Sequence, residues 1–180
     1  MRLTGQPDYA RRVTEANLKL TADNHWPDNT SCCHRVLGDL DADAGNHASA
    51  RTHYESALKI ARGISFRPAL IEALLGRGRF LAKTSEFLKN SEVSTTDAFN
   101  DLNEALNYAV EGGYRIYEAD IRVALAWAWL ALTPGPSPKS GRGEQARAEA
   151  ERALQMSTEM GYYWGKLDAQ EVLERMKAEG

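Results

Sequence analysis

The sequence predicts an all-α protein with about seven main helices and no sheet, and three observations support this. The first is composition: 26 alanines and 19 leucines stand against 11 valines and isoleucines, and the first two residue types favour helix whereas β-branched types favour strand. The second is a pattern of small residues at helical spacing that recurs along the chain. The third is a glycine that follows each occurrence of the pattern. Together they predict antiparallel helical hairpins.

The recurring pattern is small-x3-large-x2-Ala-Leu. It begins at Ala50, Ala98 and Ala146, a step of 48 residues each time, although Ala150 is small at the second place. A pair of residues precedes each occurrence, namely Leu37-Gly38, Leu75-Gly76 and Leu125-Ala126. A glycine follows each occurrence, namely Gly63, Gly113 and Gly161. The pair, the pattern and the glycine recur in the same order three times, which predicts a repeated structural unit.

The first complete unit is a hairpin of two helices, at 27–43 and 47–62. Gly45-Asn46 separates them, with Asn46 as the expected N-cap. The second helix carries one face of small and large residues at steps of three and four, namely Ala50, Tyr54, Ala57, Leu58 and Ala61. The alanines, with Gly38 on the first helix, let the two helices approach closely. Tyr54 fills the space that they leave.

The other elements follow in order within what we expect to be a single domain over residues 1–180. The boundaries are a half unit at 8–22, unit 1 at 27–63, unit 2 at 67–112, unit 3 at 115–161 and a capping helix at 162–178. In the half unit, Tyr9, Val13 and Ala16 repeat the spacing of a second helix whose first helix is missing. This open half unit predicts a surface for self-association and a chain that is a fragment of a larger repeat region. The capping helix has the polar outer face of a solenoid end.

Units 2 and 3 carry insertions between their helices, at 83–96 and 133–144. The first is polar and either extends a helix or forms an extra turn, with Thr95 or Thr96 as the next N-cap. The second, TPGPSPKSGRGE, has three prolines and three glycines, which predicts a mobile loop at 134–143 and no helix. It resembles peptides translated from short palindromic DNA repeats in bacterial genes. The alternative is a proline-rich recognition motif.

Composition excludes several classes of function. A net charge of −3 and a pI near 5.8 leave no basic field for nucleic acid. No apolar run is long enough to cross a membrane, and residues 1–20 lack the apolar core of a signal peptide. We therefore expect a cytoplasmic protein that binds neither nucleic acid nor membrane.

We find no enzyme signature and predict neither a catalytic residue nor a cofactor. The acidic pairs Asp41/Asp43 and Glu149/Glu151 are interpreted as surface charge. Cys32-Cys33-His34, with His25 nearby, invites a metal site, but adjacent residues on a helix point about 100° apart and do not converge on one ion. The two remaining histidines, His47 and His53, are expected to be solvated.

The spacing of Leu37-Gly38, Ala50, Tyr54 and Ala57 resembles the tetratricopeptide repeat (TPR), strongly in unit 1 and more loosely in units 2 and 3. The resemblance implies a TPR-like α-solenoid, a right-handed superhelix of antiparallel helical hairpins whose concave face is lined by the first helix of each unit. The long units, with junctions such as 105–112, are similar to the repeats of bacterial signal-transduction (STAND-type) ATPases.

The resemblance implies a protein-interaction scaffold, a sensor or regulatory module that binds a protein or peptide on its concave face. The family's groove positions fall on Cys32, Arg35 and Asp39; on Leu70, Ala73, Arg77 and Phe80; and on Asp120, Val123, Trp127 and Leu130. Because arginine and aromatic residues dominate binding hot spots, the candidate contacts are Arg35, Arg77, Phe80 and Trp127, with Asp39 and Asp120 as rim charges. Phe80 and Trp127 could instead pack between units. The alternative function is a docking or small-ligand-binding module of an enzyme complex.

Overall fold

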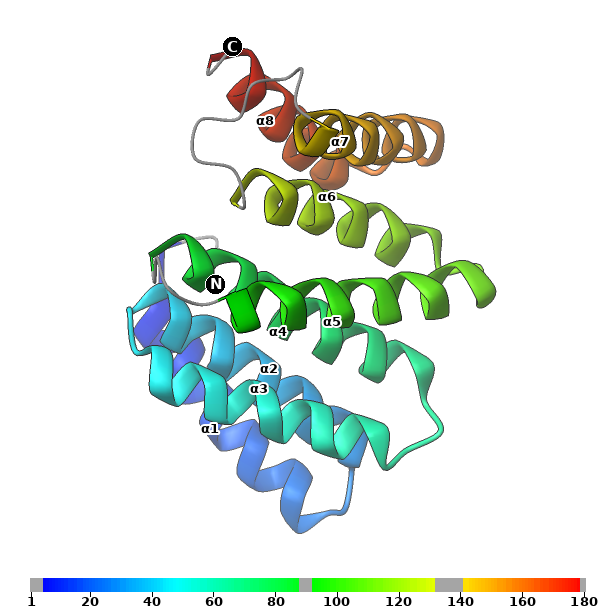
Figure 1. The fold of residues 1–180 in the computed structure, drawn as a ribbon. Coiled ribbons are helices and arrows are strands. Elements are labelled where there is room, and N and C mark those ends of the chain that lie inside the picture. The colour runs from blue at the N-terminus through cyan, green and yellow to red at the C-terminus, as the bar shows by residue number, and fades with distance from the viewer. Residues whose placement is uncertain (1–4, 88–91, 132–140, 179–180) are drawn as a thin grey trace. The chain divides into compact units, whose positions relative to one another are not determined.

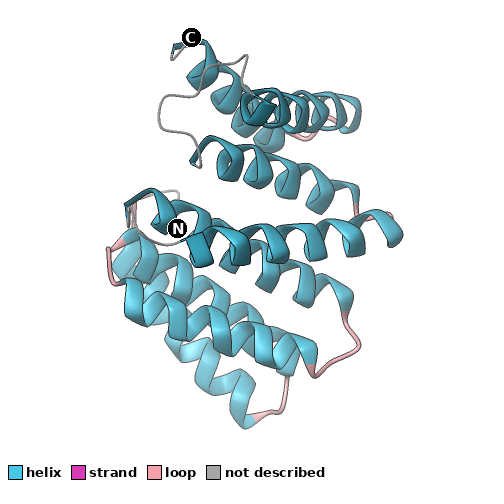
Figure 2. Ribbon diagram, viewed as in Figure 1, coloured by secondary structure: helices cyan, strands magenta, loops and turns pink. Residues whose placement is uncertain are grey.

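The computed structural model describes residues 5–87, 92–131 and 141–178, and these residues form eight helices and no strand (Figures 1 and 2). The helices are α1 (Pro7–Asp23), α2 (Pro27–Asp43), α3 (His47–Arg62), α4 (Arg67–Phe87), α5 (Glu92–Glu111), α6 (Arg115–Ala131), α7 (Gly141–Met160) and α8 (Tyr163–Ala178). The all-α prediction is confirmed. The count of about seven is wrong, because the half unit, the six hairpin helices and the capping helix each form a separate helix.

The chain divides into two compact units, Met1–Phe80 and Leu81–Gly180. In the first unit, α1 packs on α2, and α2 packs on α3 (Figure 1). In the second unit, α5 packs on α6, α6 on α7, and α8 on both α6 and α7. The expectation of a single domain stays a prediction.

Four of the turns between helices share one hydrogen bond, from a backbone N–H to the carbonyl five residues earlier. The pairs are Trp26 to Thr21 (2.9 Å), Asn46 to Asp41, Tyr114 to Ala109 and Tyr162 to Ser157 (each 2.8 Å). The residue before each donor has a positive φ, which places it in the left-handed region that favours glycine. Three of the four are glycines, Gly45, Gly113 and Gly161, and the fourth is His25 with φ of 57°. The turns at Gly45, Gly113 and Gly161 therefore exist as predicted, one more exists without a glycine, and Gly63 has a φ of −81° and does not form such a turn.

The predicted small-residue face is buried in each second helix. In α3, α5 and α7 every alanine at its first and third places is 0% exposed, namely Ala50, Ala57, Ala98, Ala105, Ala146 and Ala153. Gly38 and Gly76 lie so close to Tyr54 that an added Cβ would be 3.0 and 3.2 Å from its ring. The small residues thus allow close helix contact around a buried tyrosine, as their spacing indicates.

The expected register of α1 is wrong by one residue. Tyr9 and Val13 are 44% and 37% exposed, whereas Ala10 and Thr21 are buried. The shared turn hydrogen bond aligns Thr21 with Ala109 and Ser157, which places Ala10 and not Tyr9 at the position of Ala98 and Ala146. The pattern favours the register that starts at Tyr9, since Thr14 and Asn17 do not match it in the other register, but contact with α2 buries Ala10 beside Leu37 and Leu40.

Three expectations about helix ends also need correction. The helix α5 begins at Glu92, so Thr95 and Thr96 lie inside it and are not N-caps. The helix α7 begins at Gly141, so 141–144 is helical, because a glycine costs a helix only about 1 kcal/mol and Gly143 is buried. Asn46 is the N-cap residue of α3, but its side chain makes no capping hydrogen bond. Residues 132–140, which include most of the expected mobile loop, lie outside the described residues.

Candidate functional site

The first group of candidate residues centres on Arg35 of α2. Its Nη1 donates to Asp39 Oδ2 at 3.0 Å, and its Nε lies 3.4 Å from Glu72 Oε2 of α4. The hydroxyl of Tyr54 donates to the other oxygen of Asp39 at 2.7 Å. Arg35 and Asp39 thus belong to one polar network that joins α2, α3 and α4.

This network keeps the Arg35 guanidinium charged although the side chain is half-buried. Burial lowers the pKa of Arg35, but the carboxylates of Asp39 and Glu72 outweigh it and hold that pKa above its ordinary value. About a quarter of the Arg35 side chain stays accessible to solvent. The guanidinium is thus held by two carboxylates of its own chain, and only part of the side chain faces solvent.

Arg77 and Phe80 lie on α4 and differ in exposure. Arg77 is half-buried. Phe80 is only 5% exposed, and its ring centroid lies 5.2 Å from that of Tyr54 and 6.1 Å from that of His47. Phe80 therefore fills the interior of the first unit and offers little surface to a partner.

The candidate residues of the second unit lie on α6. The carboxylate of Asp120 accepts a hydrogen bond from the Tyr162 hydroxyl at 3.1 Å. Trp127 is partly buried and packs against an apolar cluster that includes Ala126 and Ala150. Asp120 therefore anchors the turn before α8, and Trp127 has both a packing role and an accessible edge.

Sequence reasoning missed a second arginine network, in the hairpin of α6 and α7. Arg122 donates to Glu118 through Nε at 3.0 Å and Nη2 at 2.8 Å, and to Glu149 of α7 through Nη1 at 2.8 Å. Glu149 is therefore not the solvated surface charge that the sequence suggested. Burial lowers the pKa of Arg122, but its bonds to Glu149 and Glu118 hold it above the ordinary value.

Two further expectations about charge are wrong. Asp41 is 3% exposed and accepts hydrogen bonds from Arg11 at 2.7 Å and Ser49 at 2.5 Å. Burial raises the pKa of Asp41, but the bonds from Ser49 and Arg11 hold it below its ordinary value. His53 is not solvated, because it contacts Asp41 and His34. His53 and Glu149 each lie three residues after the first alanine of the pattern, Ala50 or Ala146. A polar residue at that place on the second helix is the sequence signal that indicates a contact with the first helix.

Neither a protein-family model nor a curated protein matches the chain. Across the described residues, each helix is too short or too polar to traverse a lipid bilayer.

Proposed function

We propose that the chain is a non-catalytic protein-interaction scaffold of the TPR type, which binds a protein or peptide through the face formed by its first helices. The observation that supports the proposal is the recurrent packing of α3, α5 and α7, each of which buries its small-residue face completely. In repeat proteins, hairpins with such recurrent packing characteristically present extended binding surfaces.

The residues that we propose as contacts are those on first helices that keep accessible surface. In the first unit these are Arg35 and Arg77, and in the second unit Trp127. Asp39 and Asp120 fix neighbouring tyrosines and supply negative charge at the edge of the same helices. Phe80 is buried against Tyr54 and is therefore not proposed as a direct contact.

The accessible part of Arg77 favours a partner segment with a carboxylate, since a guanidinium can bind a carboxylate through two hydrogen bonds. A role as the sensor or regulatory part of a bacterial signalling protein in the cytoplasm belongs to the same proposal. It rests on the resemblance of the long units to repeats in signal-transduction ATPases.

Replacing Arg77 or Trp127 with alanine should weaken partner binding by roughly tenfold or more, the usual effect of removing a hot-spot side chain. The partner is first identified by affinity capture with mass spectrometry. Its affinity for each purified variant is then measured by isothermal titration calorimetry.

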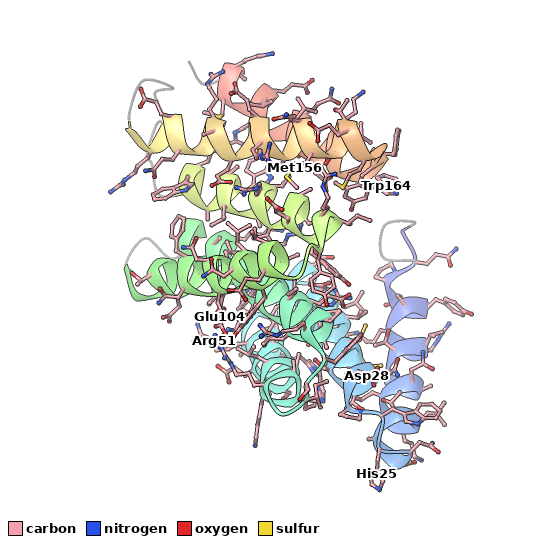
Figure 3. All side chains as sticks on the ribbon, turned by 90° about the vertical axis from the view of Figure 1, so that its right-hand side faces the viewer. His25, Asp28, Arg51, Glu104, Met156 and Trp164 are labelled. Carbon is pink, nitrogen blue, oxygen red and sulfur yellow. The ribbon has the colours of Figure 1, made fainter. Side chains whose placement is uncertain are left out.

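Arg51→Ala is the matched control, because Arg51 is an exposed arginine on the second helix α3 (Figure 3). Circular dichroism checks that each variant is folded. Wild-type affinity in an Arg77/Trp127 double variant would place the binding site elsewhere. A Trp127→Ala variant that unfolds would assign Trp127 to packing, and the Arg77 variant alone would then test the face.

A further inference from the structure

Two histidines join α2 to α3 in the first unit. The Nδ1 atoms of His34 and His53 are 3.0 Å apart, and the two rings are tilted by 40° with centroids 5.3 Å apart. At this distance one nitrogen must carry a hydrogen and the other must accept it. The contact therefore requires that one of the two rings has a free Nδ1 lone pair.

Charged groups on three helices lie around the pair. His53 Nε2 lies 3.7 Å from Oδ2 of the buried Asp41, which also receives hydrogen bonds from Arg11 of α1 and Ser49. Glu72 of α4 contacts Arg35 of α2 and not the histidine pair. A single added proton leaves one Nδ1 free to accept a hydrogen, so the contact between the two rings survives it.

A second proton breaks the contact. With both rings charged, two N–H groups face each other across 3.0 Å and neither nitrogen can accept. Consistent with this, burial and the neighbouring His53 lower the pKa of His34 from its ordinary value of 6.5.

The second unit has a different pair at the same place. His34 lies four residues before Gly38, and Arg122 lies four residues before Ala126. Likewise His53 lies three residues after Ala50, and Glu149 three residues after Ala146. Where the first hairpin has two histidines, the hairpin of α6 and α7 has an Arg122–Glu149 ion pair at 2.8 Å. An ion pair of this kind keeps its charges until the carboxylate is protonated, well below the range in which histidine titrates.

We propose that His34 and His53 form a proton-operated latch between α2 and α3, closed while the pair holds at most one added proton and opened by the second. Acidification then loosens the first hairpin and leaves the hairpin of α6 and α7 closed. The first unit would be a mildly acid-sensitive part of the scaffold.

The direction in which stability changes with pH follows from proton binding. A histidine whose pKa is lower in the folded than in the unfolded chain binds fewer protons when folded. Stability then falls with falling pH, starting near the unfolded value of 6.5. The contribution of the His34–His53 contact to stability is therefore present at pH values well above 6.5 and is lost progressively as the pH falls below it.

Hydrogen exchange followed by mass spectrometry tests the latch in the full chain. Protection factors, corrected for the intrinsic pH dependence of exchange, are compared at about pH 7.5 and about pH 5.5. We expect protection of α2 and α3 to fall about fivefold at the lower pH, the effect of losing one interhelical hydrogen bond. Protection of α6 and α7 should stay unchanged.

The matched variant is the double substitution His34→Arg and His53→Glu, which gives the first hairpin the pair found in the second. It should abolish the pH response of α2 and α3. His34→Gln keeps a hydrogen-bonding side chain that does not titrate, so it should also abolish the pH response of α2 and α3. This single variant replaces the double variant if the latter does not fold. His25→Asn is the control, because His25 is an exposed histidine in the turn after α1 (Figure 3) and should leave the response intact.

Three results would overturn the proposal. One is equal protection of α2 and α3 at the two pH values. Another is a loss of protection in α6 and α7 as large as that in α2 and α3. The last is a full pH response in both the His34→Gln variant and the double variant.

Discussion

Replacing Tyr54 with alanine is expected to cost about 3–5 kcal/mol of unfolding free energy, the usual cost of removing a buried aromatic side chain. Tyr54 is 2% exposed, and its ring lies against Gly38, Gly76 and Phe80. Neither glycine has a side chain that could move into the space left behind. Urea unfolding followed by far-ultraviolet circular dichroism measures the loss.

Tyr54→Phe is the matched control for this prediction. It keeps the ring and removes only the hydroxyl that donates to Asp39 at 2.7 Å. Since a hydrogen bond to a charged group contributes about 1.5–3 kcal/mol, this variant should lose less stability than the alanine variant. Similar losses in the two variants would show that the hydroxyl, and not the ring, holds the first unit together.

Replacing Ala105 with leucine should destabilise the second unit by about 1–3 kcal/mol through overpacking. Ala105 is 0% exposed on the face of α5 that repeats Ala57 and Ala153. A leucine side chain fits there only if helices that are already in contact move apart. The same urea experiment, or a thermal melt, measures the effect.

Ala148→Leu makes the same substitution at an exposed position of α7 and should change stability by less than about 0.5 kcal/mol. The comparison separates overpacking from any general effect of leucine on a helix. If Ala105→Leu were as stable as the wild-type chain, the repeat register assigned to α5 would be wrong.

Much of the fold follows from local pattern. Helix spacing and composition predict that the chain is all helical, because both reflect the backbone preferences of neighbouring residues. The burial of Ala57, Ala105 and Ala153 also follows, since a face defined at steps of three and four residues repeats in the same order each time. Gly113 and Gly161 mark turns because the left-handed conformation there suits glycine.

Less of the candidate site could be predicted. The sequence indicates that Arg35 and Asp39 share a helix face, since they are four residues apart. It does not show that Tyr54 and Glu72 complete their network, or that Phe80 is buried behind it. These facts depend on which side chains of different helices meet.

The sequence by itself determined that this protein is helical and which face of α3, α5 and α7 is buried, because a period of 3.6 residues is a local property of the chain. Only the tertiary structure decided the partners across helices, such as Arg11 with Asp41, 30 residues apart, and Arg122 with Glu149, 27 residues apart. The helix α1 shows the physical reason. Its pattern favours the register that buries Tyr9, but Ala10 is buried instead because it packs beside Leu37 and Leu40 of α2.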